Sequence, residues 1–169
     1  MKKILSIIIL LIVTLSCNNI QKGKVERENE PDIIGVESDD SEMNLAIEKA
    51  KLNIKNFDSA LKSNNPKFIN FSVKKPYETE SGNEHIWISD VVLKGDKYLG
   101  VIGNTPEYTS EIKLGDTVLV DKSEISDWMY IEENKLRGGY TIRALRNKMS
   151  ESEKKQFDNE NGMIIEDEK

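Results

Sequence analysis

The chain has 169 residues, of which 32% are charged and 37% are hydrophobic, and its formal net charge is −6. A single cysteine and a single histidine exclude a disulfide framework, a Cys/His zinc finger and a His-rich metal site. The negative balance argues against nucleic acid as the main partner. We therefore expect one domain with flanking segments, no metal and no other cofactor.

The N-terminus has the pattern of a secretory signal peptide. Lys2 and Lys3 precede an almost unbroken apolar run over residues 4–15. That run is too short to span a bilayer, which needs about 20 apolar residues. Its length fits the apolar core of a signal peptide, which we predict over residues 1–16.

The apolar run ends at Thr14-Leu15-Ser16-Cys17, which resembles a bacterial lipobox. In such precursors the cysteine receives a diacylglyceryl group, and its amine is acylated, for example with palmitate, after cleavage. Leucine is usual where Thr14 stands, and the alternative is an ordinary signal peptide followed by a free cysteine. Because several acyl chains anchor a protein stably, we expect Cys17 to hold this protein to a membrane of the bacterial cell envelope.

Acidic residues are concentrated at the two ends of the chain. Residues 18–42 carry eight acidic and three basic side chains, and residues 150–169 carry seven and three. Charged stretches of low hydrophobicity do not bury enough apolar surface to fold. We therefore predict a flexible acidic tether over residues 17–40 and a dispensable tail after about residue 160. The alternatives are that Ile33, Ile34 and Val36, or residues 163–165, dock on the domain.

The first folded element is predicted to be an amphipathic helix. An apolar stripe recurs every three or four residues: Met43, Ile47, Ala50, Ile54, Phe57 and Leu61. Asp40 or Ser41 can cap its start, and Ser63-Asn64-Asn65-Pro66 ends it. A helix packed on a sheet is the favoured interpretation, and a helix on a membrane surface is the alternative.

The sequence of the middle of the chain predicts short strands. We predict strands over residues 67–75, 84–94, 98–103, 117–120, 127–132 and 139–143. Pro76 is expected to end the first strand, and Gly95-Asp96 is a compact hairpin turn. The last two strands are expected to form a hairpin around residues 133–135.

A capping-box pattern, Ser150-Glu151-Ser152-Glu153, predicts a short C-terminal helix to about Asn159. The predicted fold class is α+β: an N-terminal amphipathic helix packed on a curled antiparallel sheet or small barrel, with a short C-terminal helix. The folded domain would cover residues 41–149, followed by the short helix and acidic tail over residues 150–169.

Several motifs occur in a fixed order: Glu84-His85-Ile86-Trp87, Gly100-Val101-Ile102-Gly103-Asn104-Thr105-Pro106, Gly115-Asp116, Asp127-Trp128 and Gly138-Gly139-Tyr140-Thr141-Ile142-Arg143. Together they resemble the YegJ-like family of bacterial domains of unknown function, over about residues 43–146. The resemblance implies one domain, secreted or lipid-anchored in some members. It implies no catalytic assignment.

His85 and Trp87 are candidate ligand-binding residues. Side chains two apart in a strand share a face, so these two point together with Ser89. A histidine beside a tryptophan can bind a ligand by hydrogen bonding and stacking; the alternative is a core histidine satisfied by a backbone carbonyl. Asn104 either places its amide at the rim of a pocket or forms the turn before Pro106.

Asp127 and Arg143 would meet as an ion pair if the last two predicted strands pair. A structural brace is the commoner role of such a pair, and a substrate-binding arginine is the alternative. We hypothesise that any ligand contact is built from His85, Trp87, Asn104, Asp127 and Arg143.

The function predicted from these features is an envelope lipoprotein that acts as a non-catalytic module for a small ligand or a protein. The sequence contains no Gly-x-Ser-x-Gly elbow and no His-Glu-x-x-His helix. The alternative is a small hydrolase-like enzyme that uses Glu84, His85 and Asp127 in acid–base chemistry.

Overall fold

The computed structural model describes residues 24–25, 33–34, 40–80 and 82–166. The predicted signal peptide, Cys17 and most of the predicted tether lie outside these residues. The chain divides into two units, Met1–Gly35 and Val36–Lys169. In the first unit, β1 (Lys24–Val25) pairs antiparallel with β2 (Ile33–Ile34). Ile33 and Ile34 therefore belong to a short strand whose partner is β1.

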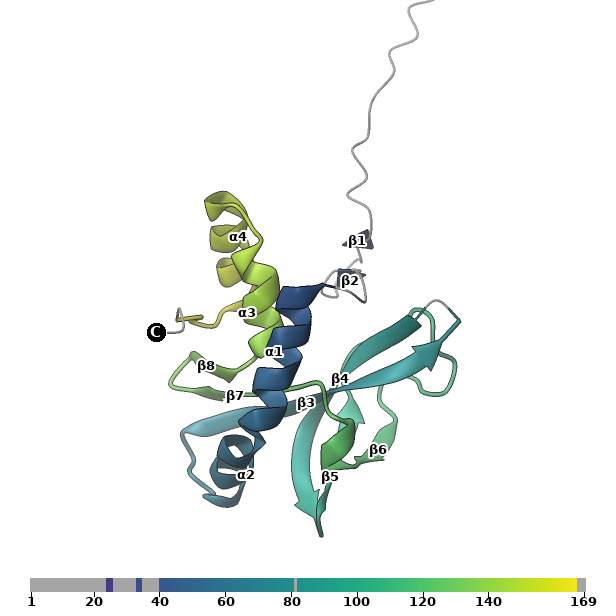
Figure 1. The fold of residues 1–169 in the computed structure, drawn as a ribbon. Coiled ribbons are helices and arrows are strands. Elements are labelled where there is room, and N and C mark those ends of the chain that lie inside the picture. Colours follow the sequence, from purple (N-terminus) through teal and green to yellow (C-terminus); the bar gives the residue numbers. More distant parts are fainter. Residues whose placement is uncertain (1–23, 26–32, 35–39, 81, 167–169) are drawn as a thin grey trace, which may run out of the picture. The chain divides into compact units, whose positions relative to one another are not determined.

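The second unit carries the remaining elements (Figure 1). In chain order they are α1 (Ser41–Leu52), α2 (Ile54–Lys62), β3 (Phe68–Thr79), β4 (Gly82–Lys94), β5 (Lys97–Ile102), β6 (Thr117–Val120), a 3₁₀ turn (Lys122–Glu124), β7 (Asp127–Glu132), β8 (Lys135–Gly138), α3 (Tyr140–Asn147) and α4 (Glu151–Asn161).

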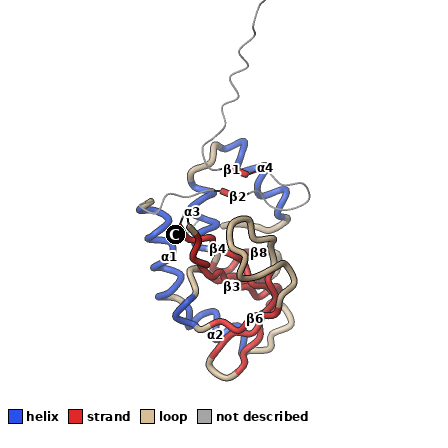
Figure 2. The backbone as a smooth tube through the Cα atoms, turned by 90° about the vertical axis from the view of Figure 1, so that its right-hand side faces the viewer, coloured by secondary structure: helices blue, strands red, loops and turns tan. Residues whose placement is uncertain are grey.

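Six strands form one antiparallel sheet in the order β6-β5-β4-β3-β7-β8. The sheet is open, with β6 and β8 at its edges, so the predicted α+β class is confirmed and the small barrel is not formed. Figure 2 shows α1 and α2 on one side of the strands. This layering follows from the apolar stripe of the helices, which needs a surface to cover.

The predicted N-terminal helix is present but is divided at Asn53. The Asp40 carboxylate accepts the backbone N–H groups of Glu42 and Met43, each at 3.1 Å, so Asp40 caps α1 as expected. Asn53 ends α1 by donating its side-chain amide to the Lys49 carbonyl at 2.9 Å. The apolar stripe continues across this break, so both helices face the sheet.

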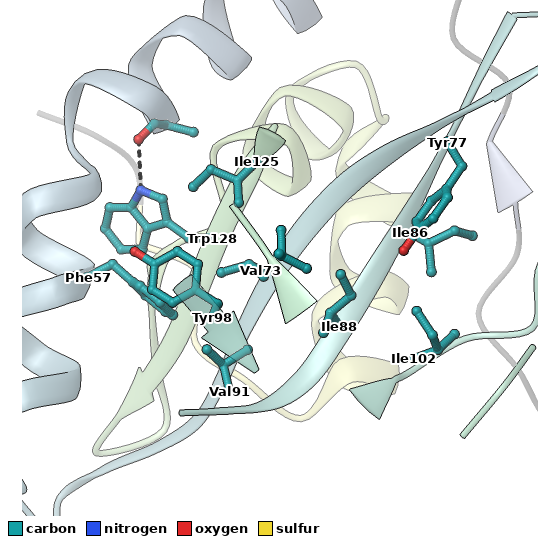
Figure 3. Packing of buried hydrophobic residues seen from close by; sticks show 12 residues of the cluster. Phe57, Val73, Tyr77, Ile86, Ile88, Val91, Tyr98, Ile102, Ile125 and Trp128 are labelled. Atoms are coloured by element: carbon teal, nitrogen blue, oxygen red, sulfur yellow. Dashed lines mark hydrogen bonds between the residues drawn. The ribbon is translucent and has the colours of Figure 1, made fainter. Parts of the chain in front are cut away.

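The main core lies between these helices and one face of the sheet (Figure 3). Phe57 is fully buried and packs edge-on against Tyr98, with their ring centroids 5.5 Å apart. The Trp128 indole packs beside Phe57 and donates to the Ala50 carbonyl at 2.8 Å. Strand residues complete this core, among them Val73, Ile86, Ile88, Val91 and Val120.

Pro76 does not end the first long strand, because β3 runs on to Thr79 with Pro76 opposite His85 in β4. The pairing of β3 with β7 stops at Lys74. Beyond that point β3 has a partner on one side only, so a residue without an N–H group is tolerated.

The predicted strand over residues 139–143 is wrong. Glu133 and Asn134 have φ of 49° and 65° and form the hairpin turn, so the return strand β8 begins at Lys135. Gly138 and Gly139 then take φ of 71° and 63°. Two consecutive left-handed residues turn the chain out of the sheet, and α3 begins at Tyr140.

The C-terminal segment is docked on the domain up to residue 166. The Ser150–Glu153 capping box forms as predicted and starts α4, which ends two residues later than expected, at Asn161. Ile164 then forms a parallel bridge with Lys135 on the outer edge of β8, and Ile165 is buried. The alternative in which residues 163–165 dock on the domain is therefore the one observed.

Candidate functional site

Three strands bring Trp87, Lys74 and Asp127 into one row across the sheet. Lys74 of β3 lies directly opposite Trp87 of β4 on one side and opposite Asp127 of β7 on the other. Directly paired residues of antiparallel strands point to the same face. His85 lies two residues before Trp87 and shares this face, as predicted. We call Lys74, His85, Trp87 and Asp127 the polar row.

Lys74 lies at the centre of the polar row and is not among the predicted site residues. Its ammonium donates to the Thr141 hydroxyl at 3.0 Å and lies over the Trp87 ring, 4.8 Å from the centroid. Burial lowers the pKa of Lys74, against the opposing pull of the Asp127 carboxylate. Two consecutive lysines in a predicted strand ordinarily indicate solvent-exposed side chains. No local sequence signal identifies Lys74, because the register of β3 with β4 is what places it opposite Trp87.

Asp127 is completely buried and caps α3 from a neighbouring strand. One of its oxygens accepts the N–H groups of Trp128 and Tyr140, at 2.8 and 3.1 Å. The other accepts the Thr141 N–H and hydroxyl, at 2.8 and 2.6 Å. Burial raises the pKa of Asp127, while these donors and Lys74 favour the ionised form. The N-terminus of α3 thus obtains from Asp127 the capping that Gly139 cannot supply.

The predicted Asp127–Arg143 ion pair does not form. Because α3 replaces the predicted strand, Arg143 points to main-chain oxygens near the β8 edge. It donates to the carbonyls of Gly138 and Leu136, at 2.9 and 2.8 Å, and to the carbonyl of Glu166. Arg143 is therefore a brace between β8 and the C-terminal segment, away from the polar row.

His85 is partly buried and is neutral at pH 7. Its Nδ1 lies 2.8 Å from the Ser126 hydroxyl, which itself lies 3.3 Å from the Lys74 carbonyl. Burial, with a smaller contribution from the Lys74 charge, lowers the pKa of His85 from 6.5 to about 4. The other ring nitrogen, Nε2, has no hydrogen-bond partner within residues 40–80 and 82–166. His85 thus keeps one ring nitrogen for a ligand.

Asn104 serves the backbone of β4. Its side-chain oxygen accepts the Trp87 N–H at 2.9 Å, and the Gly103 N–H donates to the Trp87 carbonyl at 2.8 Å. The loop after β5 thereby continues the pairing of β4 beyond the end of β5. Of the five predicted site residues, the structure places His85, Trp87 and Asp127 in the polar row, Asn104 behind it and Arg143 elsewhere.

The acid–base group of the enzymatic alternative is not assembled. Glu84 is on the opposite face of β4 from His85, and its carboxylate accepts the N–H groups of Glu107, Tyr108 and Thr109, at 2.6–3.0 Å. The oxygens of Asp127 are occupied by four donors. Glu84 and Asp127 therefore have structural roles.

Ser126 is a possible nucleophile by its distance from His85, but it is only 3% exposed. A substrate carbonyl would have to reach a buried hydroxyl that already contacts His85 and the Lys74 carbonyl. The His85–Ser126 contact therefore orients the imidazole. Within the described part of the chain, no three His, Cys, Asp or Glu side chains are grouped closely enough to hold a metal ion.

Comparisons with known proteins identify the family but no activity. Residues 40–164 match the family described as "Uncharacterized protein conserved in bacteria (DUF2314)". The chain is 39% identical over 75 residues to "Uncharacterized protein YegJ" of Escherichia coli K12, a match that covers 44% of this chain and 49% of that protein. No solved structure matches it.

A second relative is longer and carries a different description. The chain is 34% identical over 131 residues to the "Putative ankyrin repeat protein NMB1133/NMB1171" of Neisseria meningitidis serogroup B. That match covers 73% of this chain and 52% of the relative. The chain therefore spans about half the length of both relatives.

Proposed function

The chain belongs to this family of uncharacterised bacterial proteins (DUF2314), and we propose that it is a lipid-anchored protein of the cell envelope whose folded domain binds a small ligand without catalysis. The polar row is the proposed binding face. Anchoring and binding have different support and are argued separately.

The sequence at the N-terminus supports the anchor. Cys17 is the only cysteine of the chain and stands directly after the apolar run and Ser16. In the part of the chain that the structure describes, no helix is long and apolar enough to cross a membrane. A lipid on Cys17 would attach the domain without such a helix.

Lys74 carries the binding proposal. A lysine that loses hydration destabilises the fold unless its charge is compensated. Within the described residues Lys74 makes one hydrogen bond, to Thr141, and one contact with an aromatic ring. His85 and Trp87 beside it are partly exposed and keep polar groups that packing does not use. Such a desolvated cation, flanked by accessible polar aromatic rings, is typical of a binding site.

A protein partner is the second candidate, and an apolar row near the β6 edge favours it. Val92, Leu99 and Leu119 are neighbours across β4, β5 and β6. Val92 is 53% and Leu119 48% exposed. The outer edge of β6 is unpaired within the described residues, and an extended peptide could add to it as a further strand.

The anchor is tested in the native host by replacing Cys17 with alanine. We expect the wild-type chain in the membrane fraction with acyl groups on Cys17, and Cys17→Ala as an unprocessed precursor without them. Mass spectrometry of the intact N-terminus distinguishes the two. An unmodified Cys17 thiol in the membrane-associated wild-type protein would contradict the anchor.

The binding face is tested with two neighbouring lysines on opposite faces of β3. Lys75 pairs with Glu124 at 2.7 Å, away from the polar row, and is the matched control. The small-molecule fraction of an envelope extract should raise the melting temperature of the wild type and of Lys75→Met, but not of Lys74→Met. Recovery of the bound compound with its mass unchanged supports binding, whereas its conversion to a product would identify an enzyme.

A further inference from the structure

The positive charge of Lys74 has no counter-ion in direct contact. An ammonium has three N–H donors, and the Thr141 hydroxyl takes one of them, at 3.0 Å. The Trp87 ring supplies a second, weaker contact through its face. Among residues 40–80 and 82–166, no carboxylate oxygen lies within ion-pair distance of Lys74. Its charge is therefore only partly compensated.

Asp127 does not supply the missing partner. Its negative charge is directed at the first N–H groups of α3 and at the Thr141 hydroxyl, and each oxygen already accepts two hydrogen bonds. The Thr141 hydroxyl lies between Asp127 and Lys74 and links them indirectly. A hydrogen-bond donor of Lys74 therefore remains for an acceptor from outside.

The groups around Lys74 differ in their exposure. Asp127 and Thr141 are buried, whereas Lys74, His85 and Trp87 are each partly exposed. A ligand can therefore approach Lys74 along the side formed by His85 and Trp87. The Trp87 ring contacts Lys74, and His85 lies close enough to feel the Lys74 charge. Each ring has an N–H or ring nitrogen without a partner in the described residues.

We propose that Lys74, flanked by Trp87 and His85, binds an oxyanion group, a carboxylate or a phosphate, of the ligand. This inference rests on the proposed binding function and adds the chemical class of the ligand. An oxyanion would accept the remaining Lys74 donor and offset its charge in a partly desolvated position, where such hydrogen bonds are strong. The Trp87 ring would border the part of the ligand next to the anion.

The single histidine of the chain provides a direct readout. The Lys74 charge contributes to the low pKa of His85, and a bound anion would offset that charge. Asp127 is the other charged group of the polar row and is buried on the far side of Lys74. Binding at Lys74 should therefore raise the pKa of His85, which NMR of the imidazole resonances measures.

The experiment titrates acetate and, separately, inorganic phosphate into the full chain in neutral detergent micelles, with chloride at matched ionic strength as the blank. We expect a saturable shift of the His85 resonances by at least one anion, with a dissociation constant on the order of millimolar for so small a probe. The tighter of the two probes indicates whether the ligand carries a carboxylate or a phosphate.

Variants locate the binding. The shift should persist in Lys75→Met and disappear in Lys74→Met. It should also persist in Lys74→Arg, which keeps the positive charge. Lys74→Arg is the second variant if methionine at this position prevents folding. No saturable shift in the wild type, or a shift that survives in Lys74→Met, would overturn the proposal. If an envelope compound binds at the polar row and neither anion competes with it, the oxyanion inference fails while the binding function stands. If nothing binds there, both fail.

Discussion

The two faces of β3, β4 and β7 have opposite chemistry, although adjacent residues of the same strands form them. On the helix-covered face, Val73 lies between Ile88 and Trp128. One residue along, Lys74 lies between Trp87 and Asp127 on the other face. The first row is apolar and almost fully buried, whereas in the second Lys74 and Trp87 are partly exposed and only Asp127 is buried.

This difference separates stability from binding chemistry. Burial of apolar side chains contributes most of the free energy of folding, and the row around Val73 lies in the main core. The polar row contains a partly compensated cation, which costs stability, and a histidine that costs stability only below pH 6.5, where the unfolded chain would protonate it. Its residues are therefore expected to contribute less to folding and more to recognition.

The two tryptophans of the chain test this contrast most strongly. Trp128→Ala should lower the free energy of unfolding by about 3–5 kcal/mol, because it empties a core site and removes the bond to the Ala50 carbonyl. Trp87→Ala should cost about half as much, since that ring is partly exposed. Urea denaturation of both variants measures the difference. Equal losses would show that both faces act as core.

Asp127→Asn should have the next largest effect, a loss of about 3 kcal/mol. The side-chain NH2 group would replace one oxygen and face either the Tyr140 N–H or the Thr141 N–H, so one set of donors loses its acceptor. Lys74 would also lose its nearest negative charge. Asp158→Asn is the control, because Asp158 pairs with Arg146 nearer the surface. Hydrogen exchange should show faster exchange in α3 of Asp127→Asn, and unchanged exchange there would contradict the capping role.

The neutral His85 should make stability depend on pH. Its pKa is about 4 in the folded chain and ordinarily 6.5, so between these values the unfolded chain binds a proton that the folded chain does not. Stability from this group is therefore present above pH 6.5 and is lost as the pH falls towards 4. The expected loss between pH 7 and 5 is up to about 2 kcal/mol. His85→Gln should remove that part of the pH dependence, and an identical slope in both proteins would contradict the assignment.

Arg143→Lys should have the smallest effect of the four, about 1–2 kcal/mol. A lysine cannot reach three carbonyls in the fork geometry of a guanidinium, so the contact with Glu166 should loosen first. The amide of Ile164, which donates to the Asn134 carbonyl at 2.7 Å, should then exchange faster. Ligand binding at the polar row should be unchanged. A weaker ligand affinity in this variant would show that Arg143 belongs to the binding site.

Local sequence features predicted the helices and their capped starts. The apolar repeat, the Asp40 cap and the Ser150–Glu153 capping box predicted helices that the structure contains. The alternation of side chains placed His85 and Trp87 on one face. These features depend on backbone periodicity and on hydrogen bonds between near neighbours.

The tertiary structure decided which side chains meet. From sequence alone, Gly138 and Gly139 are compatible with either a strand or a turn. In the structure both are left-handed, and α3 begins directly after them. Arg143 therefore lies on a helix and does not meet Asp127. Lys74 became the centre of the candidate site through the register of β3 with β4 and β7. Register between strands depends on the packing of the whole sheet, so it cannot be predicted from the sequence of one strand.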